Sequence, residues 1–219
     1  MVPSCTEVDP ERFLRELPRR FAKYPRSEHP KDRRFAPILA DVGGLARENN
    51  LVLLNLAASL LDAGESYVEV GSFKGLSLIA AMLGNRGDFV GIDNFTLDDG
   101  SRALLEANLR RYGLAGHTVL EGDAFELLRR GALGDRRVGV YYYDAAHDYR
   151  SQVRGLRLIE PHLAAGALLI VDDTDWPQVA RAMRDYLARQ PRAELLVTLD
   201  GKDRGQPWWW EGVQVLRWR

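Results

Sequence analysis

Two short segments of this 219-residue chain place carboxyl groups and an imidazole at close spacing. The run YDAAHDY contains Asp144 and His147, and the run VDDTDW contains Asp172 and Asp173. Each run follows a short apolar segment typical of a buried strand. Three neighbouring carboxylates would repel one another unless a cation lay among them, and hard divalent ions such as Mg²⁺ or Ca²⁺ take carboxylate oxygens. We therefore expect Asp144, Asp172 and Asp173 to bind a divalent cation.

The same residues also have a structural interpretation. Both runs lead into predicted helices, so Asp172 and Asp173 could cap a helix and Asp144 could pair with an arginine. His147 comes three positions after Asp144, and the pKa of imidazole near neutrality suits proton removal. A single histidine in a loop is more often a polar surface residue. We interpret Asp144 and His147 as catalytic, with His147 as the general base.

Alternating short strands and helices must bring these runs together. From residue 66 onward, β-branched or aromatic segments alternate with amphipathic stretches, the pattern of a parallel sheet covered on both faces. We expect strands at 67–70, 89–92, 118–121, 138–143, 167–171, 194–199 and 212–218, and helices near 75–83, 100–112, 123–130, 149–163 and 177–189. The last two strands have no helix between them and are predicted to form a closing antiparallel pair. The sequence thus predicts an α/β, Rossmann-like, doubly wound sheet of seven strands, five of them parallel, with ligands at the carboxyl ends.

The first part of the chain has a different pattern. Residues 10–22 and 37–62 carry apolar residues at helical spacing, and residues 24–34 are charged and interrupted by proline. We expect two or three helices there. The predicted division is a helical extension or lid at 1–64 and a ligand-binding domain at 65–219.

The loops after the first three strands could hold a nucleoside. The first strand leads into Glu69, Gly71, Ser72 and Gly75, a glycine-bearing turn that lets a ligand approach the backbone. Phe73 occupies a position where the dinucleotide fingerprint needs glycine, so a pyrophosphate would fit poorly. Asp93 and Asp123 follow the next two strands. Each of these features alone could be an ordinary turn or helix cap, but together they describe a nucleoside site.

Composition excludes several classes of protein. The 30 Lys and Arg residues nearly balance the 31 Asp and Glu residues, so no net field favours nucleic acid or anionic lipid. The charge-free run from Leu51 to Leu61 is far shorter than the ~20 residues that cross a bilayer. Cys5 is the single cysteine, which excludes an internal disulfide and a cysteine-based zinc cluster. Residues 1–20 show no secretory signal, so the expected location is the cytoplasm.

The motifs resemble a known enzyme family. The run YVEVGSFKGLS is similar to the first motif of class I S-adenosylmethionine-dependent methyltransferases, in the branch with Glu-x-Gly-x-x-x-Gly followed by a small hydroxyl residue, here Ser77. That branch includes the catechol and caffeoyl-CoA O-methyltransferases, in which the fourth strand ends Asp-x-x-Lys and the fifth Asp-Asn or Asp-Asp. The pair YDAAHDY and LIVDDTDW is closer to the bacterial metal-dependent family of macrocin-type sugar O-methyltransferases. The resemblance covers about residues 65–176.

The resemblance implies a role for each matching residue. The methionine and ribose part of S-adenosylmethionine would lie against Glu69, Gly71, Ser72 and Gly75, the ribose hydroxyls on Asp93, the adenine beside Asp123 and Ala124, and a divalent cation such as Mg²⁺ on Asp144, Asp172 and Asp173. His147 stands where the catechol-type enzymes have lysine, which leaves the identity of the base open. The implied activity is metal-assisted methylation of a hydroxyl on a small molecule, a secondary-metabolite sugar or a phenol.

Two other classes of function stay open at this stage. An NAD(P)-binding oxidoreductase is disfavoured by the missing third glycine and by the absence of a Tyr-x-x-x-Lys pair after the fourth strand. A non-catalytic nucleoside-binding protein is disfavoured by the carboxylates and His147. We expect the methyl acceptor to contact the N-terminal helices, residues 112–117, Trp176 and the loop at 200–210. Trp208–Trp210 would form a pocket wall or a contact between subunits of a homo-oligomer.

Overall fold

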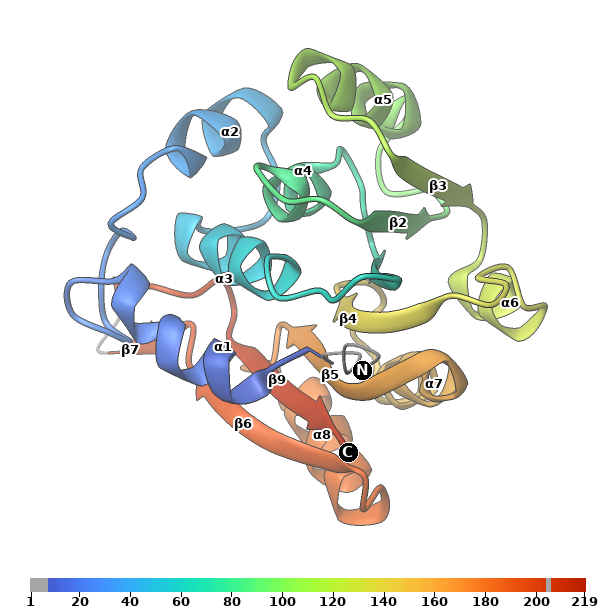
Figure 1. Cartoon of the computed structure of the whole chain (residues 1–219). Coiled ribbons are helices and arrows are strands. Elements are labelled where there is room, and N and C mark those ends of the chain that lie inside the picture. Colours follow the sequence, from blue (N-terminus) through green and yellow to red (C-terminus); the bar gives the residue numbers. More distant parts are fainter. Residues whose placement is uncertain (1–7, 204–205) are drawn as a thin grey trace, which may run out of the picture.

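The fold is built on one mixed sheet with helices on both faces (Figure 1). The computed structural model describes residues 8–203 and 206–219, so Cys5 lies outside the described residues. The main sheet contains β1 (Glu65–Val70), β2 (Asp88–Asp93), β3 (His117–Glu121), β4 (Arg137–Tyr143), β5 (Leu163–Asp172), β6 (Ala193–Leu199) and β9 (Val213–Trp218), in the order β3-β2-β1-β4-β5-β9-β6. Strands β7 (Lys202–Asp203) and β8 (Gln206–Pro207) form a separate pair.

The strand directions confirm the predicted topology. Strands β3, β2, β1, β4 and β5 pair in parallel. Strand β9 runs antiparallel to both β5 and β6 and so closes the sheet between them. The order reverses between β1 and β4, so the loops after these two strands diverge at the topological switch point, where ligands bind in such sheets.

Helices cover the two faces of the sheet as separate groups (Figure 1). The helices are α1 (Pro10–Glu16), α2 (Phe35–Val42), α3 (Glu48–Ala58), α4 (Leu76–Met82), α5 (Ser101–Arg111), α6 (Ala124–Arg129), α7 (Tyr149–Ile159) and α8 (Pro177–Arg189), with short 3₁₀ turns at Pro18–Arg20 and Glu160–His162. Apolar residues of α1–α5 pack on one face, and those of α6–α8 pack on the other.

Alternation along β4 shows how each face receives its side chains. Val140 and Tyr142 belong to the core under α1–α5, whereas Tyr141 and Tyr143 belong to the core under α6–α8. Successive side chains of a strand point to opposite faces, so the three consecutive tyrosines divide between the two cores. Tyr142 and Asp144 therefore share a face at the end of the strand.

The N-terminal region forms separate helices, as expected. The stretch 37–62 divides into α2 and α3 because Gly43 and Gly44 both have positive φ values, +67° and +151°. A Cβ at Gly44 would lie 2.8 Å from Leu76 of α4, so glycine is required where this turn approaches the sheet domain. Helix α3 is buried along its whole length. Among the described residues, every helix is too short or too polar to traverse a bilayer.

Candidate active site

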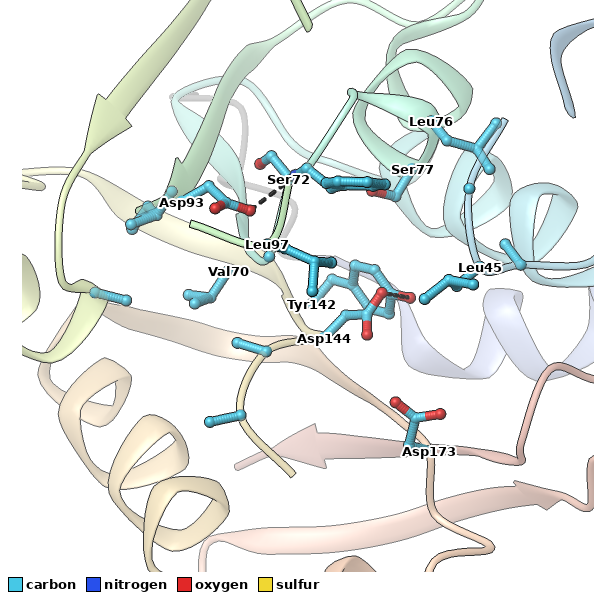
Figure 2. Close-up of a pocket in the computed structure, with 18 of the residues that line it drawn as sticks. Leu45, Val70, Ser72, Leu76, Ser77, Asp93, Leu97, Tyr142, Asp144 and Asp173 are labelled. Carbon is cyan, nitrogen blue, oxygen red and sulfur yellow. Dashed lines mark hydrogen bonds between the residues drawn. The ribbon is translucent and has the colours of Figure 1, made fainter. Parts of the chain in front are cut away.

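A cavity of about 790 Å³ opens at the carboxyl ends of β1, β2, β4 and β5 (Figure 2). Its volume lies within the range of about 300–1,000 Å³ that small-molecule sites occupy. Of the residues singled out from the sequence, the walls contain Gly71, Ser72, Asp93, Asp123, Ala124, Asp144, His147 and Asp173. Glu69, Gly75 and Asp172 lie outside the lining. The structure thus brings most of the predicted site residues together around one space.

The turn after β1 is tied to its neighbours by the backbone. Gly71 donates its N–H to the carbonyl of Ile92 at 2.8 Å, and Asp144 donates its N–H to the carbonyl of Val70 at 2.9 Å. Gly71 has φ of +101°, and a Cβ there would lie 1.7 Å from the carbonyl oxygen of Asp144. Only glycine lets the ends of β1 and β4 approach so closely. The close approach places Asp144 directly beside the turn predicted to hold the cofactor.

Gly75 has a packing role that the resemblance did not imply. It precedes α4 with φ of +89°, and a Cβ there would lie 3.3 Å from Leu105 of α5. Gly75 therefore allows α5 to pack against the start of α4, and its predicted contact with the cofactor stays a prediction.

Asp93 organises two loops at the cavity edge. Its Oδ2 accepts the N–H of Phe73 at 2.7 Å, and its Oδ1 accepts the N–H of Phe95 at 2.6 Å. Phe73 and Phe95 have positive φ values of +46° and +55°. Non-glycine residues adopt such conformations only where the surroundings enforce them, and such residues cluster at ligand sites. Figure 2 shows the carboxylate of Asp93 directed at the turn after β1, and because Asp93 lines the cavity its remaining lone pairs could meet ribose hydroxyls.

Asp123 both caps a helix and lines the cavity. Its Oδ1 accepts the N–H of Glu126 at 3.0 Å, which makes it the N-cap of α6. Asp123 and Ala124 also line the cavity. The cap fixes the start of α6 at the side of the cavity that lies across β2 and β3.

Glu69 lies beneath the cavity instead of in its wall. Its side chain is fully buried and accepts hydrogen bonds from the hydroxyls of Tyr67 at 2.9 Å and Ser77 at 3.1 Å. Burial raises the pKa of Glu69 to about 7. The cofactor contact implied by the resemblance for Glu69 stays a prediction, and in this structure its carboxyl group is held by neighbouring side chains below the cavity.

The buried Glu69 has a measurable consequence for stability. Because its pKa rises from 4.5 in the ordinary state to about 7 when folded, the folded chain retains a proton that the unfolded chain loses between these pH values. The free energy of unfolding should fall across this range, with Glu69 contributing roughly 3 kcal/mol. We expect Glu69→Gln to reduce the loss of stability between pH 5 and pH 8 by up to that amount, measured by urea unfolding. Glu121→Gln, at an exposed position, is the control. Equal losses in wild type and Glu69→Gln would contradict this prediction.

Asp144, His147 and Asp173 form one compact group. One ligand atom from each lies within 4.8 Å of the other two. The Nε2 of His147 is 2.5 Å from Oδ2 of Asp173, and the imidazole packs on the ring of Trp176 with centroids 4.9 Å apart. Figure 2 shows Asp144 and Asp173 approaching the cavity from different strand ends. A single cation with oxygen ligands at about 2.0–2.6 Å could bridge atoms at this spacing.

The loop after β5 explains the position of Asp173. Asp173 has φ of +56°, and Thr174 and Asp175 donate their N–H groups to the carbonyls of Gly212 at 3.2 Å and Glu211 at 2.9 Å. The loop is thus fastened to the turn before β9. This geometry turns the Asp173 carboxylate toward His147.

Asp172 lies outside the group, which differs from the predicted set of three aspartates. Its Oδ2 accepts the hydroxyl of Tyr142 at 2.5 Å, and its Oδ1 accepts the N–H of Asp173 at 3.0 Å. The side chain is buried, at 1% exposure. In the described residues, the cluster able to hold a cation contains His147 in the place predicted for Asp172.

The surroundings oppose the ionisation of Asp144 and Asp172 and favour that of His147. Burial, and then the charge of Asp173, raises the pKa of Asp144 to about 7. Burial and the charges of Asp144 and Asp173 raise the pKa of Asp172 well above its usual value. The contact with Asp173 is the main cause that raises the pKa of His147. A divalent cation would favour the ionised carboxylates, so the arrangement suits one.

The N-terminal helices and two tryptophans complete the cavity. Trp176, Trp210 and residues around α3, which are among the parts predicted to contact the acceptor, line it. Trp210 donates its backbone N–H to Oδ1 of Asn50 at 3.0 Å. The neighbouring Trp209 is buried in the core. Residues 112–117 are absent from the lining.

Sequence reasoning missed Tyr142 and Asn50 as lining residues. For Tyr142 the signal was its position two residues before Asp144 on the same strand face.

Comparison with known proteins identifies the fold and then the domain. The O-methyltransferase from Bacillus cereus in complex with SAH aligns with a TM-score of 0.63 and 15% identity, covering 87% of this chain and 92% of that one. Cofactor-bound Rv0187 from MTB gives 0.65 and 20%, covering 86% and 91%. The TDP-rhamnose 3'-O-methyltransferase CalS11 of calicheamicin biosynthesis gives 0.58 and 20%, covering 100% and 99%. The chain therefore has the fold of class I S-adenosylmethionine-dependent methyltransferases.

A family comparison agrees with the fold. Residues 68–174 match a family model described as a methyltransferase domain. No curated protein sequence matches the chain. The match to a methyltransferase domain agrees with the fold that the chain shares with the solved methyltransferases. The oxidoreductase and the non-catalytic binding protein are not favoured.

Proposed function

We propose that this enzyme methylates a hydroxyl of a small molecule with the help of a divalent cation at Asp144 and Asp173. The observation that carries the proposal is the convergence of Asp144, His147 and Asp173 beside the Gly71 turn in one cavity. A donor turn and an acidic cluster in the same space are what metal-assisted methyl transfer requires. The acceptor would be a secondary-metabolite sugar or a phenol.

The cofactor would occupy the side of the cavity formed by β1, β2 and β3. The turn at Gly71 and Ser72 would lie against the methionine and ribose part, Asp93 would accept the ribose hydroxyls, and Asp123 with Ala124 would border the adenine. Asp93 is already fixed by two backbone N–H groups, so its carboxylate is held in place before a ligand arrives. Such preorganisation reduces the entropic cost of binding.

Asp144 and Asp173 would hold the cation, with His147 beside them. When bound, the cation would lower the pKa of the acceptor hydroxyl and orient it. His147 would accept the hydroxyl proton, and the Oδ2 of Asp173, 2.5 Å from Nε2, would stabilise the protonated imidazole. Trp176 holds the imidazole plane in position. Asp172 would support the site from behind, in contrast to the direct ligand role that the sequence predicted.

Residues 1–64 would provide much of the acceptor side. Leu45, Leu51 and Leu54 line the cavity together with Trp176 and Trp210. Leu45 and Trp176 are exposed at 61% and 39%, so both can present apolar surface to a ligand in this cavity. We propose that the helical extension acts as a lid that excludes water from the reacting oxygen.

Thermal unfolding tests the proposed cofactor. SAH, NAD and Mg²⁺ are added separately to the full chain, and the unfolding midpoint is recorded for each. SAH at 100 times its dissociation constant should stabilise the protein by about 2.7 kcal/mol, and Mg²⁺ should also raise the midpoint. A rise with NAD in the absence of a rise with SAH would overturn the proposal.

A further inference from the structure

The hydroxyl of Tyr142 lies between two carboxylates. It is 2.5 Å from Oδ2 of Asp172 and 3.1 Å from Oδ2 of Asp144. Figure 2 shows Tyr142 and Asp144 side by side in the cavity wall. A phenol has one proton to donate and can also accept one, so this hydroxyl can donate to one of the two groups while it accepts a proton from the other, which joins the two carboxyl groups in one hydrogen-bonded unit.

The strand geometry makes this contact possible. Tyr142 and Asp144 are two residues apart and therefore share one face of the sheet. Tyr142 pairs with Ile170 in the parallel register of β4 and β5, which brings the end of β5, with Asp172, beside it. The ring of Tyr142 is buried, at 3% exposure, within the core under α1–α5. Its hydroxyl is thus fixed by packing and cannot follow a carboxylate that turns away.

Both oxygens of Asp172 are engaged, by Tyr142 and by the N–H of Asp173. Asp144 is engaged at Oδ2 alone by this hydroxyl. A carboxylate held at one oxygen presents its other oxygen in a defined direction. Partners of this kind, placed behind the groups that bind a metal, orient them and tune their affinity.

We infer that Tyr142 is a positioning residue for the divalent cation. It links Asp144 to the buried Asp172 and fixes the orientation in which Asp144 meets the ion. This inference rests on the proposed cation site and adds to it a residue that need not touch the ion. It also gives Asp172 a role, as the buried partner that anchors the Tyr142 hydroxyl.

The test is to titrate the full chain with Mn²⁺ in the presence of SAH. The electron paramagnetic resonance signal of free Mn²⁺ measures how much of the ion is bound. Tyr142→Phe removes one oxygen and keeps the ring, and it should weaken Mn²⁺ binding by about 10-fold or more. SAH affinity, measured by calorimetry, should stay within about twofold of wild type. Tyr142→Phe that binds Mn²⁺ as tightly as wild type would overturn the inference.

Tyr141→Phe is the matched control. Tyr141 is also a buried tyrosine of β4, but it belongs to the opposite core, and its hydroxyl is donated to the carbonyl of Gly155 at 3.2 Å. This variant should bind Mn²⁺ like wild type. An equal loss in both variants would show that any buried hydroxyl of β4 matters for general stability, and would also overturn the inference.

A second variant covers the case in which Tyr142→Phe fails to bind SAH and has therefore lost its fold. Asp172→Asn alters the partner of the hydroxyl, and it too should weaken Mn²⁺ binding; wild-type affinity would contradict the inference. In the double variant, the loss of Mn²⁺ affinity should be close to the larger of the two single-variant losses and smaller than their sum, because the two residues act through one hydrogen bond. Absence of Mn²⁺ binding to wild type would instead refute the proposed cation site itself.

Discussion

Replacing Asp144 with Asn should lower kcat/KM by about 1,000-fold, since the loss of several kcal/mol of charge stabilisation is expected when a catalytic metal is removed. Asp144 is the member of the acidic group that lies directly against the Gly71 turn, where the cofactor is proposed to bind. Its backbone is fixed to Val70 and its side chain to Tyr142. The amide keeps the shape of the carboxylate but removes its charge, so SAH should still bind. The measurement is SAH formation from labelled S-adenosylmethionine, with any phenol or sugar that the wild type methylates.

Asp148→Asn is the control for this loss. Asp148 lies in the same loop, is exposed, and caps α7 by accepting the N–H groups of Arg150 and Ser151. Asparagine is about as good an N-cap as aspartate, so the variant should keep wild-type turnover. If Asp144→Asn retained more than a tenth of wild-type kcat/KM, the proposed role of Asp144 would be wrong.

Gly71→Ala is expected to abolish SAH binding and to destabilise the fold. The added Cβ would lie 1.7 Å from the carbonyl oxygen of Asp144, which is backbone and cannot move without separating β1 from β4. We expect a loss of more than about 100-fold in SAH affinity and of at least about 2 kcal/mol in the free energy of unfolding, because strain at a positive φ adds to the clash. Calorimetry and urea unfolding measure the two effects.

Gly64→Ala separates the clash from the backbone conformation. Gly64 has φ of +87° but nothing within 4 Å of an added Cβ, and it lies before β1 at the other end of the strand. This variant should lose only about 1 kcal/mol of stability and no SAH affinity. Equal effects in Gly71→Ala and Gly64→Ala would mean that the approach of Asp144 to Gly71 is unimportant.

The sheet could be predicted from the sequence because each strand combines β-branched or aromatic residues with turns at its ends. The start of β5 could not. It begins at Leu163, whereas the pattern predicted 167, because Ala164, Ala165 and Gly166 carry little strand preference. Pairing of Leu163 with Val138 extends the strand, which is a tertiary effect that local sequence does not report.

The candidate site was predictable at the level of strands but not of individual side chains. The rule that ligands bind at carboxyl ends identified both acidic loops. It could not decide between Asp172 and Asp173, because neighbouring residues point in opposite directions and the choice depends on the left-handed backbone of Asp173. The burial of Glu69 was hidden for a similar reason, since it depends on Tyr67 and Ser77 closing over it.

The most direct test of the cation site is a crystal structure with SAH and Mn²⁺, read from the anomalous scattering of manganese. The proposed function predicts a single strong peak from a manganese ion that is coordinated by carboxylate oxygens of Asp144 and Asp173. The ion should lie close to the imidazole of His147 and beside the sulfur of SAH. Full occupancy of SAH with no manganese peak at these residues, or with the peak at a distant surface, would contradict it.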